Sequence, residues 1–339
     1  MKTKVLVCGI AGASLGTEII KSLLKAERYT VYGCDISPIA YGHWMDGIDQ
    51  SFTVSSENYT SNVLAIARNQ EIHVIVPGGD APAILLGKEI DCFTQHGITV
   101  AGNNAFVVET CSDKKKCGDF LESHGFDSPK TCDANNLNAV DFKPCIVKPS
   151  VDSGGSVFVF LVKDKHDAVI YVNYLKENGK VPIIQEYLPL DEGEFTVGVL
   201  SLPDGSVYGS IAIKRVFYNK LSVSMKSELG LISSGYTQGY IDNYLDIRKQ
   251  SEAIARKLGS TGPLNIQGRV RNGKFVPFEI NPRFSASTFL RTLAGFNEVD
   301  TYLRAVGKES FEPMPDLKYG CYLRSFTEAY CLPGSEVCP

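Results

Sequence analysis

Residues 261–288 read TGPLNIQGRVRNGKFVPFEINPRFSAST. Apolar and polar side chains alternate over residues 264–270, and this period of two predicts a β-strand. Asn272-Gly273 is a two-residue hairpin signal, and a return strand is predicted over residues 275–280. The stretch therefore predicts a β-hairpin.

The return strand of this hairpin ends in polar residues. Glu279 and Asn281 are two residues apart and leave the same face, and Gln267 on the partner strand is expected beside them. Three oxygen donors with one formal charge suit Mg²⁺ that phosphate oxygens also hold. Arg283 follows two residues later, where it can reach a transferring phosphoryl group. The alternative is a hairpin with a polar outer face and no metal.

Length and composition indicate an ordinary soluble globular protein. The 339 residues suggest two or three modules. Hydrophobic residues make up 44% of the chain and charged residues 21%, which is usual for such proteins. The net charge of −4 gives no electrostatic reason for a nucleic acid or an anionic membrane as partner. No run approaches the roughly 18–20 apolar residues of a membrane span.

The cysteines and the N-terminus both bear on location. The ten cysteines are scattered, without Cys-x-x-Cys pairs or zinc-finger spacing, so reduced thiols in a cytoplasmic enzyme are expected. Lys2, Lys4 and the apolar run from Val5 resemble a signal peptide. A first strand that enters a glycine-rich turn and a helix is favoured instead, because a repeating strand–helix pattern continues from it.

That repeating pattern occupies the first hundred residues. It predicts strands over residues 4–9, 30–34, 51–54, 72–76 and 98–100, and helices over residues 15–24, 61–69 and 81–95. Gly9, Gly12, Gly16 and Asp35 invite a dinucleotide interpretation, but the glycine spacing is not Gly-x-Gly-x-x-Gly. Asp80 follows a strand at the edge where open α/β sheets bind ligands. It is either a substrate contact or the N-cap of the next helix, and the cap is favoured.

The pattern changes near Asn103. Ser112-Asp113-Lys114 opens a predicted helix. An apolar strand over residues 144–148 ends in Lys148, whose charge needs an anionic partner such as the phosphates of ATP. Residues 152–156, Asp-Ser-Gly-Gly-Ser, form a loop whose backbone N–H groups either close over phosphates or make an ordinary turn.

The rest of the chain continues with mixed elements. Strands are predicted over residues 181–186, 195–200, 207–215 and 317–328, and helices over residues 167–178, 246–258 and 288–306. The Ser-rich segment 220–238 is expected to be the least regular part, as a mobile flap or a surface excursion. Arg324 and Glu328 are charges that the pattern does not explain. There is no internal repeat.

In combination, these motifs resemble the ATP-grasp superfamily. Asn265-Ile266-Gln267 precedes Glu279-Ile280-Asn281-Pro282-Arg283, and Lys148-Pro149 precedes a Ser-Gly-Gly-Ser loop. The resemblance is greatest to the carbamoyl phosphate synthetase large subunit and related carboxylate–amine ligases, although that subunit has two such units and this chain has one. It implies an α/β fold: a Rossmann-like N-terminal domain (1–103), then an ATP-grasp fold of two α+β subdomains (104–187, with the nucleotide lid, and 188–330), and a tail (331–339).

The resemblance also implies a site for ATP and two Mg²⁺ ions, with Mn²⁺ as a substitute. Glu279 would bridge the ions, with Gln267 and Asn281 as further ligands. The nucleotide contacts would be Lys114 and Lys148 on the phosphates, the loop residues Ser153, Gly154, Gly155 and Ser156, the adenine hinge Glu186, Tyr187 and Leu188, and the ribose acid Glu194. The catalytic candidates are Arg283, Arg215 and Lys148.

The implied activity is that of a ligase. The enzyme would phosphorylate a small-molecule carboxylate with Mg-ATP and couple the acyl phosphate to an amine, releasing ADP and phosphate. One alternative is a kinase-like or carbamoyl-phosphate-type enzyme that stops at the phosphorylated product. Another is an ATP-binding regulator without catalysis. A homodimer is compatible with either enzyme.

Overall fold

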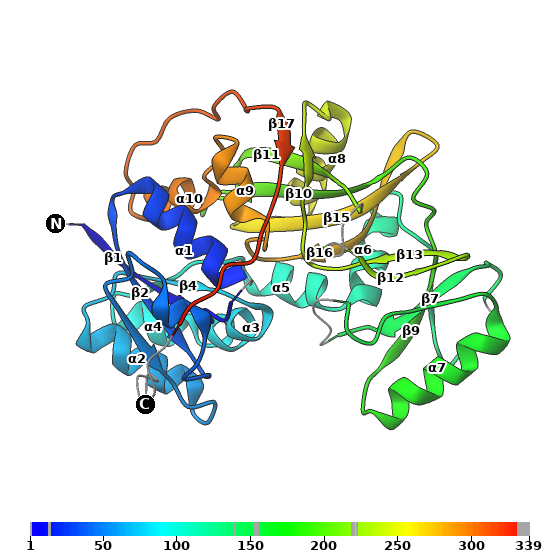
Figure 1. The fold of residues 1–339 in the computed structure, drawn as a ribbon, viewed down its shortest axis with the longest axis horizontal. Helices are drawn as coiled ribbons and strands as arrows, with labels where there is room; N and C mark the ends of the chain where they lie inside the picture. The colour runs from blue at the N-terminus through cyan, green and yellow to red at the C-terminus, as the bar shows by residue number, and fades with distance from the viewer. Residues whose placement is uncertain are drawn as a thin grey trace.

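The protein is described by a computed structural model, which covers residues 2–12, 15–137, 140–151, 156–217, 221 and 223–330. Figure 1 shows a parallel sheet near the N-terminus, a larger antiparallel sheet beside it, and a small sheet at the opposite end of the molecule. None of the helices in the described ranges combines the length and apolar character needed to cross a membrane. The cysteines in these ranges are free thiols.

The first sheet has five parallel strands in the order β3-β2-β1-β4-β5. The strands are β1 (Thr3–Cys8), β2 (Tyr29–Asp35), β3 (Gln50–Thr53), β4 (Val74–Pro77) and β5 (Thr99–Val100). The connecting helices are α1 (Leu15–Ala26), η1 (Tyr41–Trp44), α2 (Tyr59–Asn69), α3 (Asp80–Lys88) and α4 (Ile90–Gln95). The strand–helix alternation predicted from the sequence is confirmed. The single helix predicted over residues 81–95 is wrong, because the chain breaks at Glu89 into α3 and α4.

Packing explains the residues that suggested a dinucleotide. A side chain at Gly16 would bring its Cβ within 1.8 Å of the Gly9 carbonyl oxygen, so glycine is required where α1 crosses β1. The buried Asp35 carboxylate accepts hydrogen bonds from the backbone N–H groups of Ile10 (2.7 Å) and Ser37 (2.9 Å). These groups therefore have structural roles without a bound dinucleotide.

The small sheet has four antiparallel strands in the order β6-β9-β7-β8. The strands are β6 (Thr131–Asp133), β7 (Cys145–Pro149), β8 (Phe160–Val162) and β9 (Pro182–Glu186). Helix α7 (Lys165–Glu177) begins at the N-cap Asp164 and packs Val172 and Leu175 against Val147 and Ile184 of the sheet. This unit has its own hydrophobic core.

The large sheet has six strands in the order β16-β15-β10-β11-β14-β17. They are β10 (Glu194–Ser201), β11 (Val207–Arg215), β14 (Gly239–Ile241), β15 (Pro263–Arg271), β16 (Lys274–Asn281) and β17 (Gly320–Tyr322). One face shares a core with α5 (Ala105–Ser112), α6 (Lys114–Ser123) and α8 (Leu245–Leu258). Helices α5 and α6 thus pack with the large sheet, although they precede the small sheet in sequence.

The opposite face of the large sheet joins the N-terminal part. Leu200, Ile211 and Ile213 share a core with α1 and with the helices α9 (Thr288–Leu293) and α10 (Glu298–Val306). The buried side chain of Asn103 also ties the parts together, since its amide donates to the Pro263 carbonyl oxygen at 2.8 Å. The N-terminal sheet is therefore fastened to the large sheet.

Three predicted elements differ from the structure. Residues 288–306 form two helices, α9 and α10, because Gly295 between them has a φ of +101° that helical backbone does not allow. The closing strand predicted over residues 317–328 is reduced to β17. Segment 220–238 is more regular than expected, because it contains the antiparallel pair β12 (Val223–Ser227) and β13 (Gly230–Ser233). Figure 1 shows this pair, the β12–β13 hairpin, between the large and small sheets.

Candidate functional site

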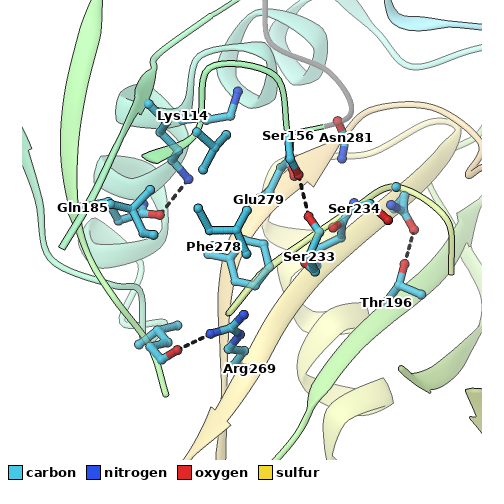
Figure 2. A pocket seen from close by; sticks show the side chains of 18 of the residues that line it. Lys114, Ser156, Gln185, Thr196, Ser233, Ser234, Arg269, Phe278, Glu279 and Asn281 are labelled. Atoms are coloured by element: carbon cyan, nitrogen blue, oxygen red, sulfur yellow. Dashed lines mark hydrogen bonds between the residues drawn. The ribbon is translucent and has the colours of Figure 1, made fainter. Parts of the chain in front are cut away.

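A cavity lies between the large sheet, the small sheet and the β12–β13 hairpin (Figure 2). It contains about 1090 Å³ of space between protein atoms, which includes open solvent at its mouth. Lys114 and Gln185 project from one side, Glu279 and Asn281 from the β16 strand, and Ser233 and Ser234 from the hairpin. The side chains predicted for metal and phosphate therefore meet in one place.

The predicted oxygen donors share one face of the β15–β16 hairpin. Gln267 pairs directly with Glu279 in the antiparallel register, Asn265 pairs with Asn281, and all four line the cavity. Pro277 cannot donate a ladder hydrogen bond, and the register shifts there, so that Phe278 has no partner opposite it. Because of this bulge, Phe278 and Glu279 both reach the cavity although they are adjacent in sequence.

This donor set fits Mg²⁺ in the presence of phosphate. Glu279 supplies a carboxylate, and Gln267 and Asn281 each supply an amide oxygen; all three side chains are half-buried. Among the described residues, no cluster of three or more His, Cys, Asp or Glu side chains is found that would hold a metal without further ligands. Hard oxygen donors that are too few to enclose an ion are typical of Mg²⁺ held jointly by protein and phosphate.

Lys148 is a buried lysine near the end of β7. Its Nζ donates to Gln185 Oε1 at 2.7 Å and lies 6.0 Å from the centre of the Phe278 ring. Burial, together with the positive charge of Lys114, lowers the pKa of Lys148 to about 7 despite the opposing charge of Glu279. An anionic ligand bound beside this amine would stabilise its protonated form, which burial disfavours.

Lys114 is the first residue of α6 and lines the same cavity. The preceding Asp113 caps the helix, since its carboxylate accepts from the backbone N–H groups of Lys115 (2.9 Å) and Lys116 (3.2 Å). The N-terminus of a helix favours anions. Lys115 and Lys116 pair with Asp119 and Glu109 on the surface, so only Lys114 of the three lysines lines the cavity.

The predicted adenine hinge begins at Glu186, the last residue of β9. Glu186, Tyr187 and Leu188 all line the cavity. The Glu186 carboxylate pairs with Arg271 at 2.9 Å, and the Tyr187 hydroxyl accepts from the Leu231 N–H at 2.9 Å. The hinge is therefore attached to the β12–β13 hairpin and to the large sheet.

Glu194 and Arg215 lie behind the cavity wall. The Glu194 carboxylate is fully buried, accepts from Arg215 Nη1 at 2.6 Å and Arg269 Nε at 2.8 Å, and also accepts from the Ser233 hydroxyl. Although burial disfavours the charged form, the two arginines hold the pKa of Glu194 below its ordinary value. Neither Glu194 nor Arg215 is among the residues that line the cavity. The ribose and acceptor roles predicted for them stay predictions.

The predicted phosphate loop is described only at its end. Ser153, Gly154 and Gly155 lie outside the described residues. Ser156 lines the cavity, and its hydroxyl donates to the Ser233 carbonyl oxygen at 2.5 Å (Figure 2). The small sheet and the β12–β13 hairpin are thus joined across the cavity.

Arg283 lies at the end of the cavity nearest the parallel sheet. Its Nε and Nη2 donate to the two oxygens of Asp80 at 2.6 and 3.1 Å. Burial opposes ionisation of Asp80, but Arg283 and then Lys114 hold its pKa below the ordinary value. The predicted N-cap role of Asp80 is wrong, because Gly79 is the cap residue and Asp80 is the first residue of α3. The carboxylate faces Arg283 instead.

Several cavity residues were not singled out from the sequence. They include Gln185, Thr196, Phe278 and Ser285, and Asn265, to which no role was given. Period-two alternation would have found Asn265, which leaves the same face as Gln267. The others depend on the bulge or on contacts between distant strands.

Comparison with known proteins places the chain in a family. A model described as an ATP-grasp domain matches residues 111–287, which is more than half of the chain. The chain therefore belongs to the ATP-grasp family. The matched span includes Lys114, Lys148, the β12–β13 hairpin and the predicted metal face of β15–β16.

Curated relatives are carbamoyl phosphate synthase large chains. That of Campylobacter jejuni is 26% identical over 261 residues, which cover 69% of this chain and 22% of the relative. That of Sulfolobus acidocaldarius is 21% identical over 340 residues, which cover 93% of this chain and 30% of the relative. The chain thus spans less than a third of the length of either relative.

Solved structures share the fold. A biotin carboxylase from C. jejuni in a β-γ-ATP complex has a TM-score of 0.68 at 15% identity, covering 94% of this chain and 74% of that one. An ADP complex of N5-carboxyaminoimidazole ribonucleotide synthetase has 0.67 at 14%, covering 94% and 80%. The biotin carboxylase domain dimer of Hydrogenobacter thermophilus 2-oxoglutarate carboxylase, crystallised with MgADP and bicarbonate, has 0.67 at 15%, covering 94% and 73%. The α/β ATP-grasp fold extends over nearly the whole chain.

Proposed function

We propose that this chain is an ATP-dependent carboxylate–amine ligase. One observation carries the proposal: Glu279 and its neighbouring amide oxygens line the same cavity as the cationic side chains of Lys114, Lys148 and Arg283. This arrangement can neutralise a triphosphate and hold a second anion beside its terminal phosphoryl group. The ATP-grasp relatives include carbamoyl phosphate synthase large chains, and a ligase that activates a carboxylate fits both this family and this cavity.

ATP would lie with its base at the hinge and its phosphates at the lysines. The hinge residues Glu186, Tyr187 and Leu188 are the base contacts in this proposal, and Ser156 with Ser153, Gly154 and Gly155 covers the phosphates. Lys148 and Lys114 pair with phosphate oxygens. The proposal does not depend on Glu194 or Arg215, whose charges are satisfied within the protein.

Gln267, Glu279 and Asn281 would hold Mg²⁺. Two ions are expected, with Glu279 as their shared ligand, and Mn²⁺ would substitute for Mg²⁺. Bound there, the metal supplies charge neutralisation on the triphosphate and orients its terminal group. The donor chemistry supports this assignment, because one carboxylate and two amide oxygens need phosphate oxygens to complete the shell.

The acceptor carboxylate would lie at Arg283. This residue is at the carboxyl end of β4, the edge where ligands bind to parallel sheets, because Asp80 contacts it there. Residues 1–103 would thus act as a Rossmann-like domain that shapes the acceptor site, with residues 104–187 as the nucleotide lid and 188–330 as the metal-bearing subdomain.

The chemistry proceeds in two steps. A carboxylate oxygen of the acceptor attacks the γ-phosphorus, the bond from that phosphorus to the β–γ bridging oxygen breaks, and ADP leaves. The amine nitrogen then attacks the acyl carbon, the bond to phosphate breaks, and the amine proton passes to phosphate or water. Lys148 and Arg283 hold the transferring group and the acceptor in line, so no protein nucleophile is needed.

We place the reaction in the cytoplasm, with small-molecule acid and amine as partners and a homodimer as the assembly to test.

Trapping the acyl phosphate tests this proposal. Carboxylic acids are screened with ATP, Mg²⁺ and concentrated hydroxylamine in place of the amine. A hydroxamate, formed with one ADP per product, is expected for the true acid. If an acid turns over ATP but accumulates a stable phosphorylated product without hydroxamate, the kinase-like alternative replaces the ligase. If no acid stimulates turnover although Mg-ATP binds, the chain is an ATP-binding regulator.

A further inference from the structure

A buried ion pair lies beneath the cavity floor. Arg291 of α9 and Glu298 of α10 are both fully buried, and Arg291 Nη1 lies 3.0 Å from Glu298 Oε1. The same carboxylate oxygen accepts from the Thr288 hydroxyl at 2.6 Å. The pair belongs to neither the predicted metal ligands nor the predicted nucleotide contacts.

The second nitrogen of the guanidinium reaches the cavity floor. Arg291 Nη2 donates to Asn265 Oδ1 at 2.6 Å, and the Thr196 hydroxyl donates to the same oxygen at 2.8 Å. Both Asn265 and Thr196 line the cavity, and the dashed line at Thr196 in Figure 2 marks its bond. The ion pair is therefore connected to the cavity through one amide oxygen.

These contacts fix the orientation of the Asn265 amide. Two donors occupy Oδ1, and a flipped amide would set its NH₂ group against the NH groups of Arg291. The amide nitrogen is therefore the group with which Asn265 meets a ligand. It lies on the face that carries Gln267 and, across the hairpin, Asn281. An N–H donor beside the predicted metal ligands can bind an anion but not a cation.

Strand β10, next to the ion pair, leaves room for it because residue 198 is a glycine. Gly198 lies opposite Asn265 in the β10–β15 register, and a Cβ there would come within 2.4 Å of Arg291 Nη1 and 2.9 Å of Glu298 Oε2. Within the described residues, Glu298 Oε2 and Arg291 Nε have no hydrogen-bond partner. An incompletely bonded buried pair is a weak source of stability, so its contact with Asn265 is the more informative feature.

We propose that Arg291, held by Glu298, is a positioning residue that turns the Asn265 amide nitrogen toward an anionic oxygen at the reacting end of the cavity. The inference rests on the proposed function. The anion is the terminal phosphoryl group of ATP or the acceptor carboxylate, which present the same chemistry to an N–H donor.

Asn265→Asp tests the donor. This variant keeps an oxygen for Arg291 and Thr196 but replaces the N–H donor with a negative oxygen. Calorimetric titration at saturating Mg²⁺ uses ADP and the β,γ-imido analogue of ATP, and the exposed Asn243→Asp is the matched control. If the terminal phosphoryl group is the anion, the analogue binds at least tenfold more weakly and ADP changes less than twofold. If the acceptor is the anion, both nucleotides bind as before and the acceptor KM in the hydroxamate assay rises at least tenfold.

Arg291→Lys tests the positioning. Lysine keeps the charge opposite Glu298 but cannot also hold Asn265 Oδ1 in the same fork. We expect Arg291→Lys to show most of the loss of affinity, or of the rise in acceptor KM, that Asn265→Asp shows. Added to Asn265→Leu, it should change the same quantity by less than a further twofold, because both substitutions act through one amide. If Arg291→Lys does not fold, Arg291→Gln with Glu298→Gln, which removes both charges, replaces it in the same cycle.

Other results overturn the inference. Unchanged nucleotide affinity and unchanged acceptor KM in Asn265→Asp would remove Asn265 as a ligand contact. Independent, multiplicative losses in the combined variant would leave Arg291 with a purely structural role. Failure of the proposed function is distinguishable, because the wild-type protein itself would then bind no Mg-nucleotide or form no hydroxamate.

Discussion

Two strand glutamates show how differently the same residue type is used in this molecule. Glu279 on β16 is half-buried and lines the cavity, and the described residues include no ion-pair partner for it within 4.0 Å. Glu194 on β10 is fully buried and is held by Arg215 and Arg269. A carboxylate that forms no direct ion pair is available to a metal or ligand, whereas one enclosed by two arginines holds the structure together.

The largest expected difference is in turnover. Glu279→Gln removes the only carboxylate of the predicted metal face, so hydroxamate formation should fall by about 10³-fold or more, the scale of losing electrostatic stabilisation of a transferring group. The midpoint of urea unfolding should stay close to that of wild type. Wild-type turnover in this variant would remove Glu279 from the site.

The reciprocal variant should lose stability. Glu194→Gln leaves Arg215 and Arg269 buried without a counter-charge, which costs about 3–5 kcal/mol of unfolding free energy. The β12–β13 hairpin should loosen as well, because Ser233 bonds to the same carboxylate. Urea unfolding measures the loss, with Glu279→Gln as the matched control. Equal stability of the two variants would contradict the division between a ligand-facing and a structural glutamate.

A third prediction concerns pH. The pKa of Lys148 is about 7 in the free protein, and phosphate charge bound beside it raises that pKa. Binding of Mg-ADP at pH 8 should therefore take up protons, and the affinity should fall by up to about tenfold per unit as pH rises above 7. Calorimetry in buffers of different ionisation enthalpy counts the protons. Lys148→Arg stays charged and should flatten the profile; a flat wild-type profile would place Lys148 away from the phosphates.

The smallest effect is expected at the cavity mouth. Asp80 is about half exposed, so its pair with Arg283 contributes at most about 1 kcal/mol of stability. Asp80→Asn should leave urea unfolding nearly unchanged but free Arg283 for the acceptor, lowering the acceptor KM a few-fold. An increased KM would show instead that Asp80 itself contacts the substrate.

Local pattern was sufficient for part of the site. Alternation with a period of two brings Gln267, Glu279 and Asn281 to one face, and an apolar strand that ends in Lys148 predicts an anion beside it. The cavity is lined by all four side chains. These features depend on residues close in sequence, and the ATP-grasp match covers the same region.

What the sequence did not reveal depends on distant contacts. Glu194 was predicted as the ribose acid, but Arg269, 75 residues away, pairs with it in the protein interior. The β12–β13 hairpin is hidden because its segment is polar and Ser-rich, and its order comes from bonds to Tyr187 and Ser156. Gly295 is a local signal for the break between α9 and α10, but the helical periodicity of residues 288–306 predicts one helix through it.

Oxygen transfer is the most direct test of the central claim, that the carboxylate of the acceptor attacks ATP. The acid found in the hydroxylamine screen is labelled with ¹⁸O in its carboxylate and incubated with the enzyme, Mg-ATP and the amine. The account predicts one ¹⁸O atom in the released inorganic phosphate for each amide formed, measured by mass spectrometry. Inorganic phosphate without ¹⁸O, with amide still formed, would contradict the acyl phosphate and with it the proposed function.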